Sequence, residues 1–181
     1  MAQPVLIPRP KLLPDFQANR VREYNILEKL ADGECSRIFK ASHETTNATV
    51  VIKVIEKNHI QSVEGRETYQ NYVDSVKSID NPNVIKVIDF FWDNDFYFIV
   101  LPYYEYSDMR KVILDSGALP ESVACHFFQQ IARGLKAGHE KGIAHKDLCL
   151  ARILMSDNEN VVVSGFQLSR SQKHSPFYSA P

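Results

Sequence analysis

Runs of β-branched and aromatic residues, separated by turn-forming residues, dominate the chain between Tyr24 and Leu101. Such runs are typical of β-strands, because branched and aromatic side chains pack well on a pleated surface. The pattern predicts five strands, over Tyr24–Leu30, Ser36–Ser42, Ala48–Ile55, Val84–Phe91 and Phe96–Leu101. Gly33 and the triplet Asp93-Asn94-Asp95 stand at two turns that favour hairpins. We therefore expect an antiparallel sheet in this part of the chain.

Helical periodicity is present in two further segments. The first is Glu64–Ile79, where residues recur at helical spacing, namely Tyr69, Tyr72, Val73 and Val76. The second opens at Pro120, and Gly142 is placed to cap its end. Its apolar positions are Val123, Ala124, Phe127, Phe128, Ile131 and Leu135. Two short strand-like segments follow, Arg152–Met155 and Asn160–Ser164, so the whole chain has an α+β pattern.

Composition narrows the class of protein. The chain has 181 residues, 44% hydrophobic and 24% charged, with a net charge of −1, as in an ordinary globular domain. A net charge near zero supplies no field for nonspecific binding to nucleic acid or to a membrane surface. The longest apolar run, Phe96–Leu101, is far too short to span a bilayer. We therefore expect neither nucleic acid nor a membrane among the partners.

Cysteine usage and the N-terminal segment indicate the compartment. Cys35, Cys125 and Cys149 are odd in number and scattered, which argues against a disulfide framework and for a reducing, cytoplasmic setting. None has zinc-ligand spacing to another cysteine or to a histidine, so no metal site is expected from them. Residues 1–20 are rich in proline and lack a signal-peptide core, and they are expected to form an extended tail.

Three motifs carry candidate chemistry. The segment Leu30–Ala41 contains Gly33, and a glycine in a hairpin lets backbone N–H groups approach a phosphate, although an ordinary turn is the commoner case. Lys53 lies inside the apolar run VVIKVI, where its ammonium group needs a partner such as phosphate unless the side chain reaches solvent. Asp147 lies in the loop AHKDLCLARIL, where it is either a proton acceptor for a substrate hydroxyl or a solvated carboxylate.

The motifs occur in the order LADGECSRIFKA, VVIKVI, NPNVIKVIDFF, FIVLPYYEYSDM, AHKDLCLARIL and VVVSGFQLSR. This series resembles the protein kinase family, of the serine/threonine type, from about Tyr24 to the last residue. Lys53 follows Ala31 by 22 residues, Asp147 follows Lys53 by 94, and Gly165 follows Asp147 by 18. The resemblance implies an N-terminal lobe at 21–101 with five strands and one helix, a hinge at 102–106, and a partial helical C-terminal lobe at 107–181.

The resemblance also implies a binding site for ATP. By it, Lys53 holds the α- and β-phosphates, and Asp147 orients the hydroxyl that accepts the phosphoryl group. The phosphate-covering loop corresponds to Ala31, Gly33 and Ser36, and the adenine walls to Leu30, Ile38, Val51 and Leu154. Leu101 resembles the gatekeeper, and the hinge offers the Pro102 carbonyl and the Tyr104 N–H to adenine. The residues that stack between the two lobes correspond to Val76, Val87, His145 and Phe166.

The sequence departs from the family pattern where kinases bind magnesium. The aspartate of the family's Asp-Phe-Gly aligns with Gly165, and the family's second metal ligand aligns with Arg152. The helix glutamate that pairs with the lysine in the family aligns with Tyr72. Mg²⁺ takes oxygen ligands, which the side chains of Gly165 and Arg152 lack, so Mg²⁺ is not expected as a cofactor. For Arg152 two readings stay open: direct contact with a nucleotide phosphate, or an ion pair with Asp147 or exposure to solvent.

These departures favour a pseudokinase, that is, a regulatory or scaffold domain that binds a protein partner, takes ATP and is deficient in phosphoryl transfer. An active kinase acting on protein substrates is the alternative, since the candidate lysine and aspartate remain. A nucleotide-independent interaction module is the third reading. The chain ends at Ser179-Ala180-Pro181, where the family continues, so the helices expected to bury Phe127, Phe128 and Ile131 are absent from a truncated lobe. Either the chain is a fragment, or a partner covers that apolar face.

Overall fold

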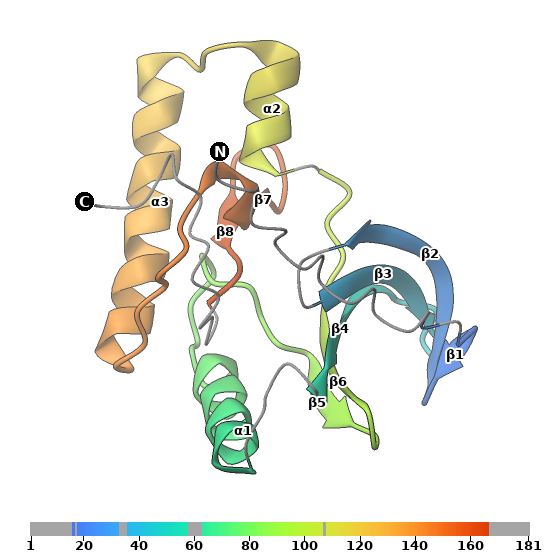
Figure 1. The fold of residues 1–181 in the computed structure, drawn as a ribbon. Coiled ribbons are helices and arrows are strands. Elements are labelled where there is room, and N and C mark those ends of the chain that lie inside the picture. Colours follow the sequence, from blue (N-terminus) through green and yellow to red (C-terminus); the bar gives the residue numbers. More distant parts are fainter. Residues whose placement is uncertain (1–15, 17, 33–35, 58–62, 107, 167–181) are drawn as a thin grey trace, which may run out of the picture.

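A curled antiparallel sheet and a helical part face one another in this protein (Figure 1). A computed structural model describes residue 16 and residues 18–32, 36–57, 63–106 and 108–166. Several features singled out from the sequence, among them Gly33, Cys35, most of the proline-rich tail and the end of the chain after Phe166, lie outside the described residues.

The sheet consists of β1 (Arg20–Val21), β2 (Tyr24–Asp32), β3 (Ser36–His43), β4 (Thr49–Glu56), β5 (Asp89–Trp92) and β6 (Phe96–Pro102). The spatial order is β1-β2-β3-β4-β6-β5, and each neighbouring pair is antiparallel. The strands predicted at the positions of β2, β3, β4 and β6 are confirmed to within two residues. The sheet has six strands and not the predicted five, because Arg20 and Val21 add a short strand along β2.

The predicted strand Val84–Phe91 is wrong in its first half, since only β5 joins the sheet. Val84 instead forms a parallel bridge to Val163, and the N–H of Ile85 donates to the carbonyl oxygen of Val163 at 3.0 Å. A continuous apolar run fits a buried strand and a buried crossing segment equally well, so periodicity did not separate the two. The crossing segment connects the sheet to the helical part.

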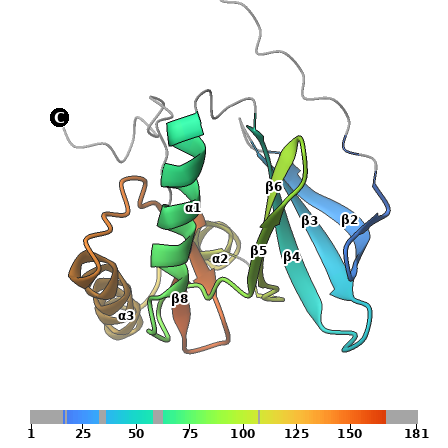
Figure 2. The ribbon, with the colours of Figure 1, turned by 90° about the horizontal axis from the view of Figure 1, so that it is seen from below.

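The helical part contains α2 (Met109–Ser116), α3 (Glu121–Glu140), the 3₁₀ turn η2 (Leu150–Arg152) and the hairpin of β7 (Ile153–Met155) and β8 (Val161–Val163). Figure 2 shows α1 (Val63–Lys77) between this part and the sheet. The helices α1 and α3 were predicted, and α2 was not. Its signals are Asp108, whose side chain accepts from the N–H of Lys111 at 3.0 Å, and Gly117 at its end. No helix within the described ranges is long and apolar enough to cross a membrane.

Two apolar clusters hold the fold. One side of the sheet carries a buried cluster made of Tyr24, Phe39, Ala41, Val50, Ile52, Val54, Phe91, Phe98 and Val100, with Phe16 packed against it. The second cluster joins α1, α3 and the β7–β8 hairpin, and Phe90, Ile99 and Leu101 of the sheet pack against it. Burying a side chain of the size of Phe98 contributes about 1.5–3 kcal/mol to the free energy of unfolding.

The buried face of α3 differs from the expectation. Phe127 is buried and Ile131 is packed against the second cluster, so the prediction that these two lack cover is wrong, whereas Phe128 is 71% exposed. The helix approaches the chain so closely that a Cβ atom at Gly134 would lie 2.5 Å from the carbonyl oxygen of Asn83. The contact face of α3 therefore includes the glycines Gly134 and Gly138 as well as Phe127 and Gln130, and an apolar pattern does not detect the glycines or the glutamine.

The end of α3 follows the sequence closely. Gly142, the residue predicted to cap it, has a φ of +72°. Its N–H donates to the carbonyl oxygen of His139, and the N–H of Ile143 donates to that of Gly138. This pair of bonds is the Schellman arrangement, which satisfies helix-end carbonyls.

Candidate functional site

The ladder register brings the sheet candidates onto one face. Ile38 pairs with Lys53, which pairs with Ile99, while Val51 pairs with Leu101 in the next row. Directly paired residues of antiparallel strands project to the same side of the sheet. This face is the one opposite the buried cluster of Phe39, Ile52 and Phe98, and it is turned to the helical part, since Ile99 and Leu101 pack there. Lys53 and Ile38 are half-buried on it.

The edges of this face hold the remaining adenine candidates. Pro102 ends β6, and Tyr104, in the segment after it, is half-buried, which raises the pKa of its phenol. Leu154 lies on β7 and forms a bridge with Asp108 just after that segment. The two walls of the proposed cleft are thus the sheet face and the β7 strand, as the sequence motifs imply.

The roof of the proposed site is only partly described. Ala31 pairs with Ile38 and belongs to the same row, and Ser36 begins β3. Leu30 lies at a register shift of β2 and is 43% exposed. Gly33 is outside the described residues, and of Tyr72 the structure gives the position on α1 but not the side chain.

A buried histidine organises the loop that carries Asp147. His145 is 4% exposed; its Nε2 lies 2.8 Å from the carbonyl oxygen of Ser164, and its Nδ1 accepts from the N–H of Asp147 at 3.3 Å. These bonds assign the ring proton to Nε2, because a carbonyl oxygen needs a donor and an N–H needs an acceptor. Burial lowers the pKa of His145, with the Ser164 bond opposing and the Arg152 charge adding to the shift. The neutral ring orients the backbone of Asp147.

The four residues predicted to stack between the lobes are all buried. Val76, Val87 and Phe166 belong to the second cluster, and the ring of His145 lies 4.8 Å from that of Phe166. The packing positions of the sequence pattern therefore form a continuous apolar connection behind the loop.

Arg152 makes an ion pair with Asp147. Its Nη2 lies 3.1 Å from Oδ2 of the carboxylate, and the two side chains are 35% and 27% exposed. The ion-pair reading of Arg152 is therefore the one found. The pair is only partly accessible to solvent and is less screened by salt than a surface pair would be.

Gly165 lies directly under the Arg152 side chain. Its φ is +83°, and a Cβ atom there would lie 2.9 Å from Cδ and 3.3 Å from Nε of Arg152. The space that a side chain at position 165 would need is thus occupied by the arginine. Sequence comparison marks both positions as departures, but it does not reveal that they are in contact.

The residues present do not fit magnesium. Of the three positions 147, 152 and 165, only Asp147 offers a carboxylate, and Arg152 already donates to it. Mg²⁺ requires oxygen ligands in octahedral geometry, which a guanidinium and a glycine hydrogen cannot supply. Across the described part of the chain, no group of three or more His, Cys, Asp or Glu residues is arranged to hold a metal ion.

Two contributors were missed from the sequence. Ile99 belongs to the Lys53 row, and the signal was available, since it is two residues before Leu101 and so on the same face. Ser164 donates from both its N–H (2.8 Å) and its Oγ (3.0 Å) to the carbonyl oxygen of Arg152. No local sequence pattern indicates that Ser164 holds Arg152, because the two residues are 12 positions apart.

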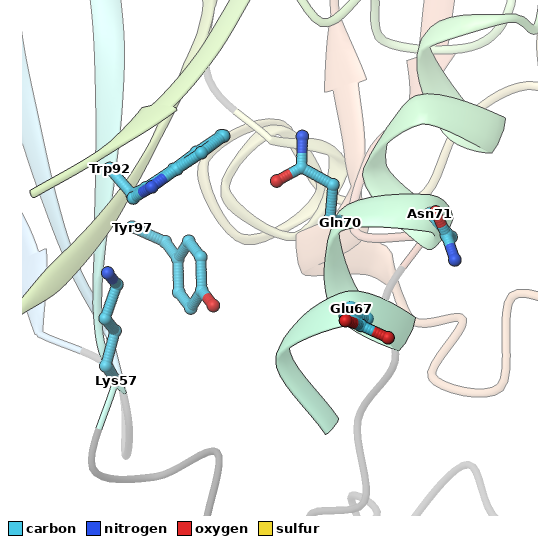
Figure 3. Close-up of a pocket in the computed structure, with 6 residues that line it drawn as sticks. All are labelled: Lys57, Glu67, Gln70, Asn71, Trp92 and Tyr97. Atoms are coloured by element: carbon cyan, nitrogen blue, oxygen red, sulfur yellow. The ribbon is translucent and has the colours of Figure 1, made fainter. Parts of the chain in front are cut away.

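A cavity of about 440 Å³ lies elsewhere, between α1 and the β5–β6 hairpin. Figure 3 shows Lys57, Trp92 and Tyr97 on the sheet side of it, and Glu67, Gln70 and Asn71 on α1. The Lys57 ammonium lies 5.1 Å from the centre of the Tyr97 ring and also donates to the carbonyl oxygen of Asp93. None of the predicted nucleotide or catalytic residues lines this cavity, so its size does not make it the candidate site.

Comparison with known proteins agrees with this geometry. The model of the protein kinase domain matches residues 24–180, and the chain belongs to the protein kinase family. It is 30% identical over 180 residues to the serine/threonine-protein kinase ULK3 of Mus musculus, covering 93% of this chain and 38% of that one. It is 28% identical over 153 residues to a probable KIN1 homolog of Enterocytozoon bieneusi (strain H348), covering 84% of this chain and 25% of the other.

A solved structure supports the kinase fold. The crystal structure of Rad53 1-466 in complex with AMP-PNP superimposes with a TM-score of 0.75 at 22% identity, covering 82% of this chain and 39% of that one. The fold is thus that of a protein kinase, with a curled antiparallel sheet as its N-terminal lobe. The chain spans between a quarter and two fifths of the length of these relatives.

Proposed function

We propose that this domain binds ATP, is deficient in phosphoryl transfer, and acts in the cytoplasm as a regulatory or scaffold pseudokinase on a protein partner. The observation that carries the proposal is the Arg152–Asp147 ion pair above Gly165. It puts a fixed side-chain cation in contact with the carboxylate that, by resemblance, orients the acceptor hydroxyl.

Nucleotide binding is supported by the intact sheet wall. Lys53, Val51 and Leu101 share one face, and the backbone groups of the segment after β6 are of the kind that bind adenine. The Rad53 structure was determined with AMP-PNP, an ATP analogue, in the same fold.

Deficient transfer is supported by the residues of the loop wall, the segment from His145 to Phe166. Phosphoryl transfer depends on metal ions that neutralise charge developing on the phosphates, together with exact positioning of the acceptor. The candidate metal positions carry Arg152 and Gly165, and the acceptor-orienting Asp147 already receives a hydrogen bond from the arginine. Several contributions to transition-state stabilisation are therefore absent together.

Protein partners are supported by the relatives, whose names identify them as serine/threonine-protein kinases. Such enzymes act on proteins, which supports a protein partner for this domain. The localisation rests on the sequence, and both described cysteines, Cys125 and Cys149, are free thiols.

The test combines binding with transfer on the full chain. A fluorescent ATP analogue is expected to bind, and Lys53→Met to weaken binding about tenfold by removing a charge-assisted contact. Lys86→Met, which changes an exposed lysine, is the matched control. Radiolabelled phosphate transfer to a generic protein substrate is expected to stay at background.

Two outcomes separate the competing functions. Magnesium-dependent phosphate transfer that is abolished by Asp147→Ala would contradict the proposal and establish an active kinase. The retained Lys53 and Asp147 are the residues that favour this alternative. Absence of analogue binding at saturating concentrations would favour a nucleotide-independent interaction module.

A further inference from the structure

We propose that Arg152 is the resident cation of this cleft. It stands where the family pattern has a metal ligand, pairs with Asp147 and, together with Gly165, excludes metal, so that the polyphosphate of a nucleotide binds without one. The polyphosphate part of this inference rests on the proposed nucleotide binding, whereas the exclusion of metal does not.

The Asp147 carboxylate is already paired with a positive charge. The guanidinium donates to the Asp147 carboxylate at 3.1 Å, so the negative charge that would attract a metal ion is already paired. A divalent cation at that carboxylate would lie within a few ångströms of a permanent positive charge, since arginine does not lose its proton in proteins. With 35% of its side chain exposed, the arginine also remains accessible to an anionic ligand, and its planar fork suits phosphate oxygens.

Arg152 occupies the space that a side chain at position 165 would need. A side chain at position 165 would begin 2.9 Å from Cδ and 3.3 Å from Nε of Arg152, so it would displace the arginine stem. The φ of +83° at Gly165 adds strain for any residue with a Cβ. A carboxylate at 165, the ligand that metal binding needs, is thus incompatible with the arginine in its present position.

Backbone hydrogen bonds hold Arg152 in place. The N–H of Arg152 donates to the carbonyl oxygen of Cys149 at 2.9 Å, and its own carbonyl oxygen accepts two bonds from Ser164, the neighbour of Gly165. The backbone of Arg152 is therefore fixed to the segment that carries Gly165. The two departures from the kinase pattern therefore act as one unit, and a carboxylate at position 165 can serve a metal only once the arginine is gone.

Mn²⁺ binding without nucleotide tests the exclusion directly, because Mn²⁺ takes the same oxygen ligands and is detected by electron paramagnetic resonance. The full chain is compared with Gly165→Asp, Arg152→Asn and the double variant. We expect no specific binding by the unaltered chain or by Gly165→Asp. The double variant should bind at least about tenfold more tightly than either single variant, which is the signature of coupled positions.

The controls keep this test decisive. Arg133→Asn removes an exposed arginine of α3 and should leave Mn²⁺ binding as in the unaltered chain. Tight Mn²⁺ binding by the unaltered chain, or by Gly165→Asp alone, would overturn the exclusion. If the double variant does not fold, Arg152→Asn against Arg133→Asn decides: equal binding by the two overturns the proposal.

Thermal shift with ATP tests the second half. The increase in melting temperature is expected to be the same with EDTA and with Mg²⁺, and to be lost in Arg152→Asn but kept in Arg133→Asn. A shift that requires Mg²⁺ would overturn metal-independent binding. Absence of any shift would instead contradict the proposed nucleotide binding itself, and the Mn²⁺ comparison would still decide whether Arg152 and Gly165 exclude metal.

Discussion

The two walls of the proposed nucleotide site are held in place by different forces. The sheet wall, with Val51, Lys53 and Leu101, is fixed by the strand register and by an apolar cluster on its opposite face. The loop wall, from His145 to Phe166, combines buried apolar residues of the second cluster with polar contacts, including the His145–Ser164 and Arg152–Asp147 contacts. On the first wall, Lys53 lies on a sheet whose main supporting cluster is on the other face, although Leu101 also packs against the second cluster. On the second wall, the candidate residues Asp147 and Arg152 themselves belong to the polar contacts that hold the loop.

This difference bears on the departures from the family pattern in the loop. The ladder of a sheet is built from backbone hydrogen bonds, so its geometry does not depend on any one polar side-chain pair. In the loop wall, a partly buried charge needs both an opposite charge and room for its side chain. For Arg152, Asp147 supplies the opposite charge and the missing side chain of Gly165 leaves the room. We therefore expect changes to the loop wall to come in coupled sets. Four measurements test the comparison.

The largest effect is expected from the cluster that supports the sheet wall. Phe98 is 2% exposed, and Phe98→Ala should lower the free energy of unfolding by about 3–5 kcal/mol, through lost burial and a residual cavity. Urea unfolding followed by circular dichroism measures it. Phe128→Ala, at a phenylalanine that is 71% exposed, is the matched control and should change stability by less than about 1 kcal/mol. Similar losses for the two variants would contradict the assignment of the core.

The polar support of the loop wall comes next. Oε1 of Gln130, a residue 3% exposed, accepts from the N–H of Val161 at 2.9 Å and from Nδ2 of Asn83 at 3.0 Å. Gln130→Ala leaves these buried donors short of an acceptor and should cost about 1–3 kcal/mol of unfolding free energy. Gln129→Ala, on the exposed side of the same helix, serves as the control in the same urea titration. A loss below that of the control would mean that the loop wall does not depend on this network.

A smaller effect is expected at the helix that adjoins both walls. Asp108 caps α2 and bridges to Leu154, so Asp108→Ala should cost about 1 kcal/mol by removing the side-chain bond to the N–H of Lys111. Asp115→Ala, an exposed position near the other end of α2, should change the midpoint of unfolding much less. Equal effects would show that the cap does not stabilise the helix.

The smallest effect is a pH dependence. The pKa of His145 is lowered in the folded state, mainly by burial, so protonation favours the unfolded chain. This contribution to stability is complete above the ordinary histidine pKa of about 6.5 and is lost as the pH falls from there towards the folded value. His145→Gln should flatten the fall in unfolding free energy below pH 6.5, by at most about 1.4 kcal/mol per pH unit. His139→Gln, on the exposed end of α3, should leave it unchanged; a flattened slope there would assign the effect to another group.

Much of the architecture is predictable from local pattern. The strands β2, β3, β4 and β6 and the helices α1 and α3 agree with segments whose periodicity is clear, and Gly142 ends α3 as expected. The failures have specific causes. The helix α2 has only eight residues, too few for its periodicity to stand out. Val84 and Ile85 belong to a run with the composition of a strand but pair with Val163 of β8 instead of the sheet.

The sequence by itself determined the family, and it predicted most of the sheet-face candidates and the departures from the metal-ligand pattern at positions 152 and 165, because order, spacing and residue type are properties of the chain. Only the tertiary structure decided what Arg152 does. The arginine, five residues after Asp147 and 13 before Gly165, lies against both. The reason is that this contact depends on the path of the backbone through η2 and β7. The bonds from Ser164 to the Arg152 carbonyl oxygen fix that path, and no spacing rule describes it.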